Sequence, residues 1–167
     1  AHYPPNEAFL DLCDELGLYA IDEVPFGMGT KNLRNADYLE VLEERARLTV
    51  ARDKLHPSVI AWTVGNENPL TDICVTCGEL VAQLDPTRPT CYPQYASVYE
   101  KMLADGAPPS AMLYDFHYVN AAKIRALAPR LDRPLFAGEF AHALGLDFGS
   151  LAETWEEMWE RPECAGG

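Results

Sequence analysis

Two stretches of the chain decide the fold: residues 59–68, VIAWTVGNEN, and residues 133–142, RPLFAGEFAH. Each contains a short apolar run, rich in β-branched or aromatic residues, that leads directly to a glutamate, Glu67 or Glu139. Runs of this kind predict buried strands, so both carboxylates are expected at the carboxyl ends of strands. In a barrel of parallel strands, that end carries the reacting groups.

Along the rest of the chain, segments with apolar residues at helical spacing alternate with short apolar runs typical of strands. Helical spacing predicts helices over residues 6–16, 36–54, 71–84, 97–104, 121–131 and 150–160. Short apolar runs predict strands over residues 18–21, 59–64, 90–92, 111–116 and 135–137, and turn-favouring residues predict a long loop over residues 24–35. A helix followed by five strand–helix units implies an α/β fold with a parallel sheet.

Both a doubly wound sheet and a barrel fit this alternation. The barrel is favoured because polar residues stand at the carboxyl ends of four successive longer strands: Glu23, Glu67, His117 and Glu139. A doubly wound sheet would instead gather its site at one switch point. A (β/α)8 barrel takes about 250 residues, and five strands cannot close it. We therefore expect this chain of 167 residues to be a piece of a larger protein or half of an obligate assembly.

The composition argues against several classes of partner. The 26 acidic and 13 basic residues give a formal net charge of −13, which disfavours nucleic acid and anionic membrane surfaces. No apolar run reaches the ~20 residues of a transmembrane helix. The opening residues, AHYPP, carry no basic start and no apolar signal segment; the location stays open, with the cytoplasm favoured.

The five cysteines are scattered and do not suggest a disulfide framework. Cys74 and Cys77 form a Cys-x-x-Cys pattern inside a predicted helix, without the second pair of a zinc ribbon. Two small core or surface residues and a redox pair are the two alternatives for this pattern.

Two carboxylates at the same end of a barrel are the smallest set of catalytic groups that can cleave a glycosidic bond. Retaining hydrolysis needs a protonated donor at the leaving oxygen and an ionised nucleophile at the anomeric carbon, about 5 Å apart. The amide of Asn66, beside Glu67, could bind a sugar hydroxyl near the reacting carbon. His142, three residues after Glu139, could orient that carboxylate or bind substrate.

Further polar and aromatic side chains could complete such a site. His117 and Tyr118 could donate a hydrogen bond to a carboxylate or a sugar, and the candidates for stacking on a sugar are Trp62, Tyr118 and Trp155. Each of these residues also fits a plainer interpretation, as a solvated loop residue or as part of helix packing.

Four stretches resemble the catalytic domain of family 2 glycoside hydrolases, the group of β-galactosidases and β-glucuronidases. The first is HYPP at residues 2–5, with FLDLCDELGLY at 9–19 and IDE at 21–23. The second is RD at 52–53, with HPSVIAW at 56–62 and GNEN at 65–68. The third is DPTRP at 85–89, and the fourth is PLFAGEFAHALG at 134–145. The similarity extends over nearly the whole chain.

The resemblance implies a TIM barrel, present here as a partial (β/α)8 barrel of roughly strands 3 to 7 with their helices. Residues 1–167 are then a single, incomplete catalytic domain. The implied partner is a carbohydrate substrate, and a homo-oligomer of the full-length parent stays open. The AHALG ending of the fourth stretch leans toward β-galactosidase over β-glucuronidase.

The resemblance also implies roles for single residues in retaining hydrolysis of β-glycosides. Glu67 matches the family's acid/base and Glu139 its nucleophile. The remaining matches are substrate-binding positions or neighbours of the nucleophile: His2, Asn66, His142, Tyr118 and, less closely, His117.

One departure from the family concerns metal. In metal-dependent β-galactosidases, a glutamate and a histidine after the Asp-Glu of the third strand hold magnesium. Phe26 and Met28 occupy those positions here, so we expect no metal at that place and no cofactor.

Two alternatives to a β-galactosidase-like enzyme remain. One is a non-catalytic, carbohydrate-binding or scaffold relative that keeps the barrel. The other is a β-glucuronidase- or β-mannosidase-type member of the same family.

Overall fold

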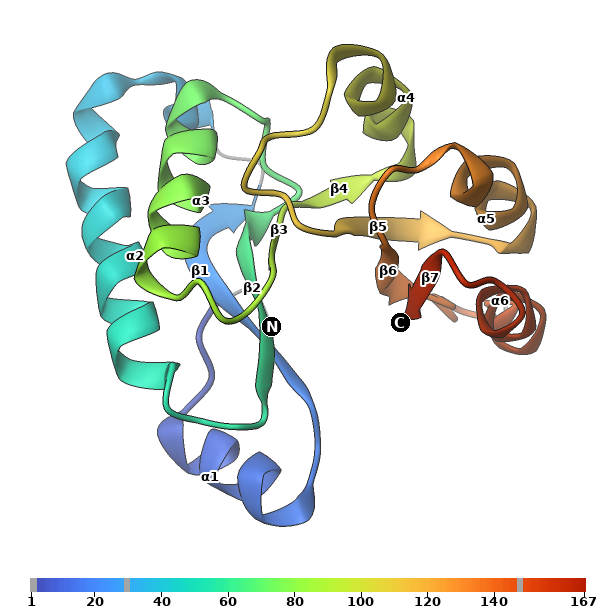
Figure 1. The fold of residues 1–167 in the computed structure, drawn as a ribbon, viewed down its shortest axis with the longest axis horizontal. Helices are drawn as coiled ribbons and strands as arrows, with labels where there is room; N and C mark the ends of the chain where they lie inside the picture. The colour runs from blue at the N-terminus through green and yellow to red at the C-terminus, as the bar shows by residue number, and fades with distance from the viewer. Residues whose placement is uncertain (1–2, 29–30, 147–148) are drawn as a thin grey trace. The chain divides into compact units, whose positions relative to one another are not determined.

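The computed structural model describes residues 3–28, 31–146 and 149–167. The chain divides into two compact units, the first comprising Ala1–Tyr92 with Pro108–Ala111 and the second Pro93–Ala107 with Met112–Gly167. Within each unit, helices and strands follow one another along the chain and all paired strands are parallel (Figure 1). This is the parallel α/β arrangement that the sequence predicts.

Unit 1 contains a three-stranded sheet of order β1-β2-β3. Its elements are α1 (Glu7–Leu16), β1 (Ala20–Met28), the 3-10 turns η1 (Lys31–Arg34) and η2 (Ala36–Tyr38), α2 (Leu39–Asp53), β2 (Val59–Asn66), α3 (Asp72–Leu84) and β3 (Thr90–Cys91). The helices α2 and α3 lie side by side (Figure 1). Every residue of β2 except Ile60 is buried, which explains its nearly continuous apolar sequence.

The ends of α1 follow from its sequence. Asn6 caps the first turn, because its Oδ1 accepts a hydrogen bond from the N–H of Ala8 at 2.9 Å. Gly17 ends the helix in the left-handed conformation, with φ of 71°, which a glycine adopts without steric cost. The predicted helix over residues 6–16 begins at this cap and ends one residue before this glycine.

The predicted loop over residues 24–35 is wrong in its first part, because β1 continues to Met28. Val24 pairs with Val64 of β2, and Met28 pairs with Asn66 after a shift of register. Pro25 is tolerated inside this strand because it lies in the register shift between Val24 and Met28, where the ladder of hydrogen bonds is interrupted. Turn-favouring residues therefore misled the sequence interpretation here.

Unit 2 contains a four-stranded sheet of order β4-β5-β6-β7. Its elements are β4 (Pro93–Tyr95), α4 (Ala96–Asp105), β5 (Tyr114–Val119), α5 (Ala121–Leu127), the 3-10 turn η3 (Ala128–Arg130), β6 (Leu135–Phe140), α6 (Leu151–Trp159) and β7 (Cys164–Gly166). The single strand predicted over residues 90–92 is replaced by β3 and β4, on either side of Tyr92. The sequence pattern did not predict β7, which pairs with β6.

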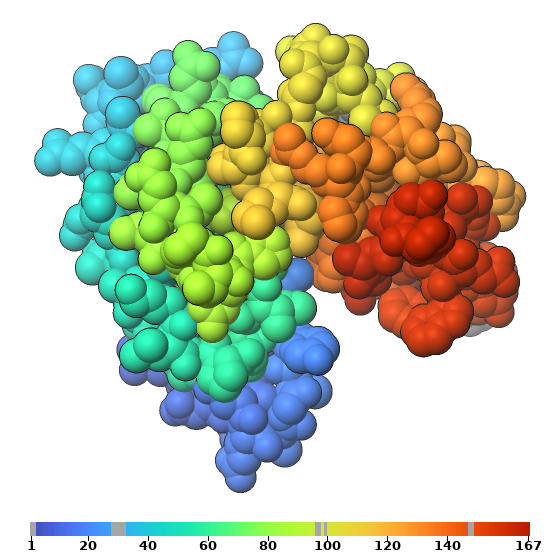
Figure 2. Space-filling model, in the orientation of Figure 1, coloured from blue at the N-terminus to red at the C-terminus, as the bar shows by residue number. Residues whose placement is uncertain are grey.

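The surface of unit 2 carries two tryptophans from α6. Trp155 stacks on Phe140 with ring centroids 6.5 Å apart, whereas Trp159 is 79% exposed. With Arg161 and Cys164 they line a pocket of about 190 Å³ in the C-terminal segment, coloured red in Figure 2. Helix packing therefore accounts for Trp155 better than for Trp159.

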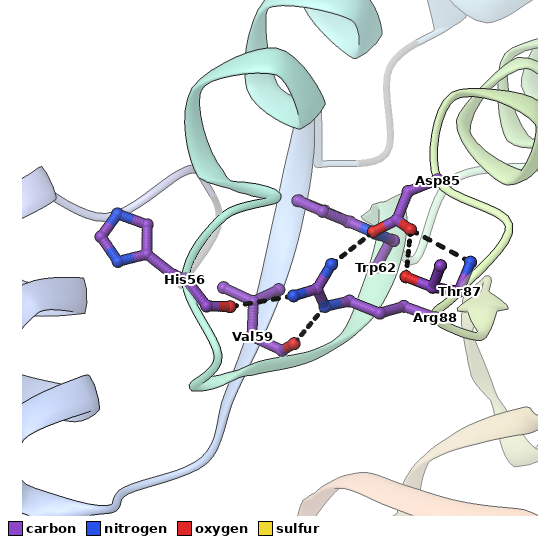
Figure 3. Close-up of polar contacts among 6 residues, drawn as sticks. All are labelled: His56, Val59, Trp62, Asp85, Thr87 and Arg88. Atoms are coloured by element: carbon purple, nitrogen blue, oxygen red, sulfur yellow. Dashed lines mark hydrogen bonds and ion pairs between the residues drawn. The ribbon is translucent and has the colours of Figure 1, made fainter.

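A polar cluster in unit 1 holds the DPTRP stretch against β2 (Figure 3). The carboxylate of Asp85 accepts hydrogen bonds from Trp62 Nε1 at 3.0 Å, from Arg88 Nη1 at 2.6 Å and from Thr87. Arg88 also donates to the carbonyl oxygens of His56 and Val59. Burial alone would raise the pKa of Asp85, but the hydrogen bonds from Thr87, Arg88 and Trp62 lower it to about 2. The DPTRP stretch that resembles the family therefore has a structural role, which is to bind the turn after α3 to β2.

A second buried carboxyl, Asp22 of β1, sits next to Asp53 at the end of α2. Both side chains are almost fully buried, and Arg52 forms an ion pair with Asp53 at 2.6 Å. Burial, and then the interaction with Asp53, raises the pKa of Asp22 from 3.8 to about 8. The folded protein thus keeps a proton on Asp22 that the unfolded chain releases near pH 4.

We predict that Asp22→Asn stabilises the full-length protein at pH 8. Between pH 4 and 8 the folded state binds more protons than the unfolded state, so wild-type stability falls as pH rises through this window. Asparagine needs no proton and retains the oxygen that accepts the Glu23 N–H. The free energy of unfolding in urea should rise by about 2 kcal/mol at pH 8 and change less at pH 5.

The matched control for this measurement is Asp37→Asn, in the exposed turn η2 of the same unit. It should leave the pH dependence of unfolding unchanged. A loss of stability in the Asp22→Asn variant at pH 8 would contradict the assignment of a proton to Asp22.

Cys74 and Cys77 are both fully buried and free. Burial raises the pKa of each thiol to about 12, so neither is a reactive thiolate at neutral pH. This favours the structural over the redox interpretation of the Cys-x-x-Cys pattern.

No helix within the described ranges is both long and apolar enough to cross a bilayer.

Candidate functional site

The residues that the sequence singles out fall into two groups, one in each unit. Asn66 and Glu67 lie at the carboxyl end of β2 in unit 1. The other group, at the carboxyl ends of β5 and β6 in unit 2, consists of His117, Tyr118, Glu139 and His142. His2 lies outside the described residues.

In unit 1, a side-chain hydrogen bond shapes the turn that carries Glu67. Asn68 Oδ1 accepts the backbone N–H of Asn66 at 2.8 Å, and Asn68 Nδ2 donates to the carbonyl of Gly27 in β1 at 2.6 Å. A Cβ at position 65 would lie 1.9 Å from Asn68 Oδ1, so Gly65 is required for this close approach. The GNEN stretch is thus a preformed turn that holds Glu67 in place.

The Asn66 side chain offers a hydrogen-bond donor. Its residue is 4% exposed, and no described residue accepts a hydrogen bond from its Nδ2 atom. A buried donor of this kind costs free energy until it finds an acceptor. The amide is therefore available to a ligand oxygen at the carboxyl end of β2, as the sequence suggests.

In unit 2, the Glu139 carboxylate lies between two imidazoles. Glu139 Oε1 is 3.7 Å from His117 Nδ1, and Glu139 Oε2 is 3.4 Å from His142 Nε2. The Glu139 side chain is 25% exposed, between the buried His117 and the more open His142. The structure thus brings three predicted residues together and leaves the Glu139 carboxylate partly exposed.

The Tyr118 ring extends this group. It meets the His142 ring edge-on at 4.7 Å between centroids, and it stacks on Tyr95 at 5.6 Å. Tyr95, at the end of β4, was not among the sequence-predicted site residues. An aromatic residue at the end of a strand could have indicated a site residue, but the predicted strand ended at residue 92, before Tyr95.

Unusual backbone conformations mark these strand ends. Among the described residues, four non-glycine residues have positive φ, and three of them stand at the ends of β2, β5 and β6: Glu67 (51°), Tyr118 (56°) and Ala141 (54°). Such conformations cost on the order of 1–3 kcal/mol each and concentrate at functional sites. Their positions support a functional assignment for these strand ends within each unit.

Two predicted stacking residues behave differently. Trp62 has no exposed surface, and its Nε1 is bonded to Asp85, so the proposed stacking of Trp62 on a sugar is wrong. Trp155 lies on α6 against Phe140. The third stacking candidate, Tyr118, is 39% exposed. Its ring contacts His142, which itself lies beside Glu139.

The third-strand metal site of the metal-dependent enzymes does not fit this chain. Phe26, at one of the two ligand positions, is 4% exposed and has no ligand atom. Elsewhere in unit 1, Asp11, Asp14 and His56 bring ligand atoms within 4.8 Å of one another. There, Asp14 already pairs with His56 Nδ1 at 2.7 Å and accepts the Ser58 N–H, which fastens α1 to the start of β2.

Comparison with known families gives a match over the whole chain. Residues 1–167 match the model of the TIM barrel domain of glycosyl hydrolases family 2. The β-galactosidase of Psychromonas ingrahamii is 32% identical over 187 aligned residues, and that of Alteromonas mediterranea is 33% identical over 189. Each alignment covers 100% of this chain and 17% of the relative, so the chain spans about a sixth of these curated relatives.

Solved structures of the same family share the fold. A family 2 member from Bacteroides cellulosilyticus superposes with a TM-score of 0.76 at 27% identity, covering 99% of this chain and 22% of that one. A β-glucuronidase from Bifidobacterium dentium gives a TM-score of 0.74 at 26% identity, covering 99% and 33%. The α/β architecture predicted from the sequence is therefore confirmed as part of a (β/α)8 barrel, and the chain belongs to glycoside hydrolase family 2.

Proposed function

We propose that the full-length protein is a retaining β-glycosidase acting on β-galactoside-like substrates, with residues 1–167 as an incomplete part of its single catalytic domain. The observation that carries the proposal is the Glu139 carboxylate, held at a strand end between His117 and His142. Family membership and the β-galactosidase names of the two curated relatives support the reaction class and the substrate class.

In the proposed first step, Glu139 attacks the anomeric carbon and forms a covalent glycosyl-enzyme. Glu67 gives its proton to the leaving oxygen as the glycosidic bond breaks. In the second step, Glu67 takes a proton from water, and the oxygen of that water displaces Glu139. Two inversions give net retention of configuration.

The neighbouring side chains have supporting roles in this proposal. The buried donor of Asn66 would bind a sugar hydroxyl next to the reacting carbon. His117 and His142 would keep the Glu139 carboxylate aligned, and the Tyr118 ring would form one side of the sugar site. His2 is proposed as a further substrate-binding residue on the basis of the resemblance alone.

The test is an assay of the full-length protein with aryl β-galactoside, β-glucoside, β-glucuronide and β-mannoside. We expect fastest aryl release from the galactoside, with the β-anomer of the sugar appearing first by NMR. Release with inversion would overturn the double displacement. Sugar binding by calorimetry without aryl release would favour the non-catalytic alternative, and preference for the glucuronide or mannoside would reassign the substrate.

A further inference from the structure

The register of the sheet in unit 2 shifts immediately before Glu139. Asp115 of β5 pairs with Phe136 of β6, and His117 pairs with Glu139. Two residues of β6, Ala137 and Gly138, therefore stand opposite the single residue Phe116. A bulge of this kind leaves the ladder interrupted and changes the direction of the side chains that follow it. The direction of Glu139 thus depends on what stabilises the bulge.

Asp115 occupies the space at the bulge. Its Oδ1 atom accepts the backbone N–H of Gly138 at 3.0 Å, which satisfies a donor inside the bulge. A Cβ at position 138 would lie 2.2 Å from the same oxygen, so the contact exists only because residue 138 is glycine. Asp115 is 3% exposed, and a buried ionisable side chain at such a position is costly unless its contacts are fixed.

The same carboxylate also faces His117. Asp115 Oδ1 is 3.8 Å from His117 Nε2, and the other ring nitrogen of His117 is 3.7 Å from Glu139 Oε1. His117 is itself 3% exposed. The His117 imidazole therefore lies between the buried carboxylate of Asp115 and the partly exposed carboxylate of Glu139. Asp115 thus contacts both the backbone of Gly138, just before Glu139, and the histidine beside Glu139.

We propose that Asp115 is a positioning residue for the nucleophile Glu139. It fixes the bulge at Gly138 and holds the His117 ring in the orientation that meets Glu139. This inference rests on the proposed function, in which Glu139 attacks the sugar. Nothing in the sequence pattern distinguished Asp115 from an ordinary buried strand residue.

The test uses Asp115→Asn in the full-length protein. Asparagine retains an oxygen that can accept the Gly138 N–H, but it removes the negative charge that faces His117. Because a displacement of about 1 Å can cost about 100-fold in rate, we expect kcat to fall by roughly 10- to 100-fold, with KM changed by less than about threefold. The rate at which an aryl 2-deoxy-2-fluoro-β-galactoside labels Glu139, followed by intact-protein mass spectrometry, should fall in proportion.

The matched control is Asp132→Asn. Like Asp115, Asp132 is an aspartate that accepts a hydrogen bond, in this case from the hydroxyl of Tyr114 in β5 at 2.8 Å. The Asp132 side chain, however, is 70% exposed. This variant should leave kcat and the labelling rate within about twofold of wild type, because Asp132 is exposed and pairs with Tyr114 and Arg133. Thermal unfolding of both variants separates a loss of folding from a loss of positioning.

The outcomes separate this inference from the proposed function. If Asp115→Asn labels Glu139 at the wild-type rate, the inference is overturned while the nucleophile assignment stands. If the wild-type protein is labelled elsewhere or not at all, the proposed function is rejected. Should Asp115→Asn fail to fold, Gly138→Ala, whose added Cβ displaces the Asp115 carboxylate, replaces it; wild-type labelling by that variant would equally overturn the inference.

Discussion

Glu139→Gln in the full-length protein is expected to lower kcat for an aryl β-galactoside by at least about 10⁴-fold, or about 5.5 kcal/mol of transition-state stabilisation. Glutamine has nearly the shape of glutamate, and its amide can still contact His117 and His142, which lie 3.7 and 3.4 Å from the carboxylate. It cannot form the glycosyl-enzyme, because the neutral amide is a very poor nucleophile. The loss should therefore appear in kcat, with a smaller change in KM.

The control for this measurement is Glu156→Gln, an exposed glutamate of α6 in the same unit. It should retain wild-type turnover. A sharper test is Glu139→Gly with added azide, which should attack from the vacated face and give the α-glycosyl azide. Wild-type-like turnover of Glu139→Gln, or a β-glycosyl azide from Glu139→Gly, would reject Glu139 as the nucleophile.

Glu67→Ala is expected to have an effect that depends on the leaving group. General acid catalysis contributes about 10²- to 10⁴-fold, so hydrolysis of a phenyl β-galactoside should slow by that factor. A dinitrophenyl leaving group needs no proton, so its first step should proceed at a nearly wild-type rate. The second step should then limit turnover, because the water no longer has a base.

Azide provides the check on this second prediction. As an anion it needs no general base, so it should restore turnover of the dinitrophenyl substrate and give the β-glycosyl azide, opposite in configuration to the product expected for Glu139→Gly. Glu79→Ala, an exposed residue of α3 in unit 1, is the matched control. An equal loss for phenyl and dinitrophenyl substrates would contradict the acid/base role of Glu67.

Local sequence signals predicted much of the fold because they act through neighbouring residues. Asn6 and Gly17 set the ends of α1 through a side-chain cap and a left-handed backbone. The apolar run of β2 matched its burial. The extent of β1 was missed because strand formation beyond Val24 depends on pairing with β2, with a register shift that accommodates Pro25, and no local signal in residues 24–35 reveals this pairing.

The site was predicted in part for the same reason. Residues next to a strand end, such as Glu67 and Glu139, can be located from the apolar runs that precede them. Asp115 was missed because its importance comes from Gly138, 23 positions away on the next strand. Trp62 was misassigned because aromatic character alone does not distinguish a sugar platform from a fully buried side chain bonded to Asp85.

The sequence by itself determined the strand–helix alternation, the two glutamates after apolar runs and the resemblance to family 2, because these are properties of contiguous residues. Only the tertiary structure decided which side chains lie around Glu139, since cross-strand register brings His117 to its carboxylate and Asp115 to the preceding Gly138. A shift of one residue in that register moves every following side chain to the other face of the sheet. The contacts of Glu139 therefore depend on a bulge that pairing between β5 and β6 creates.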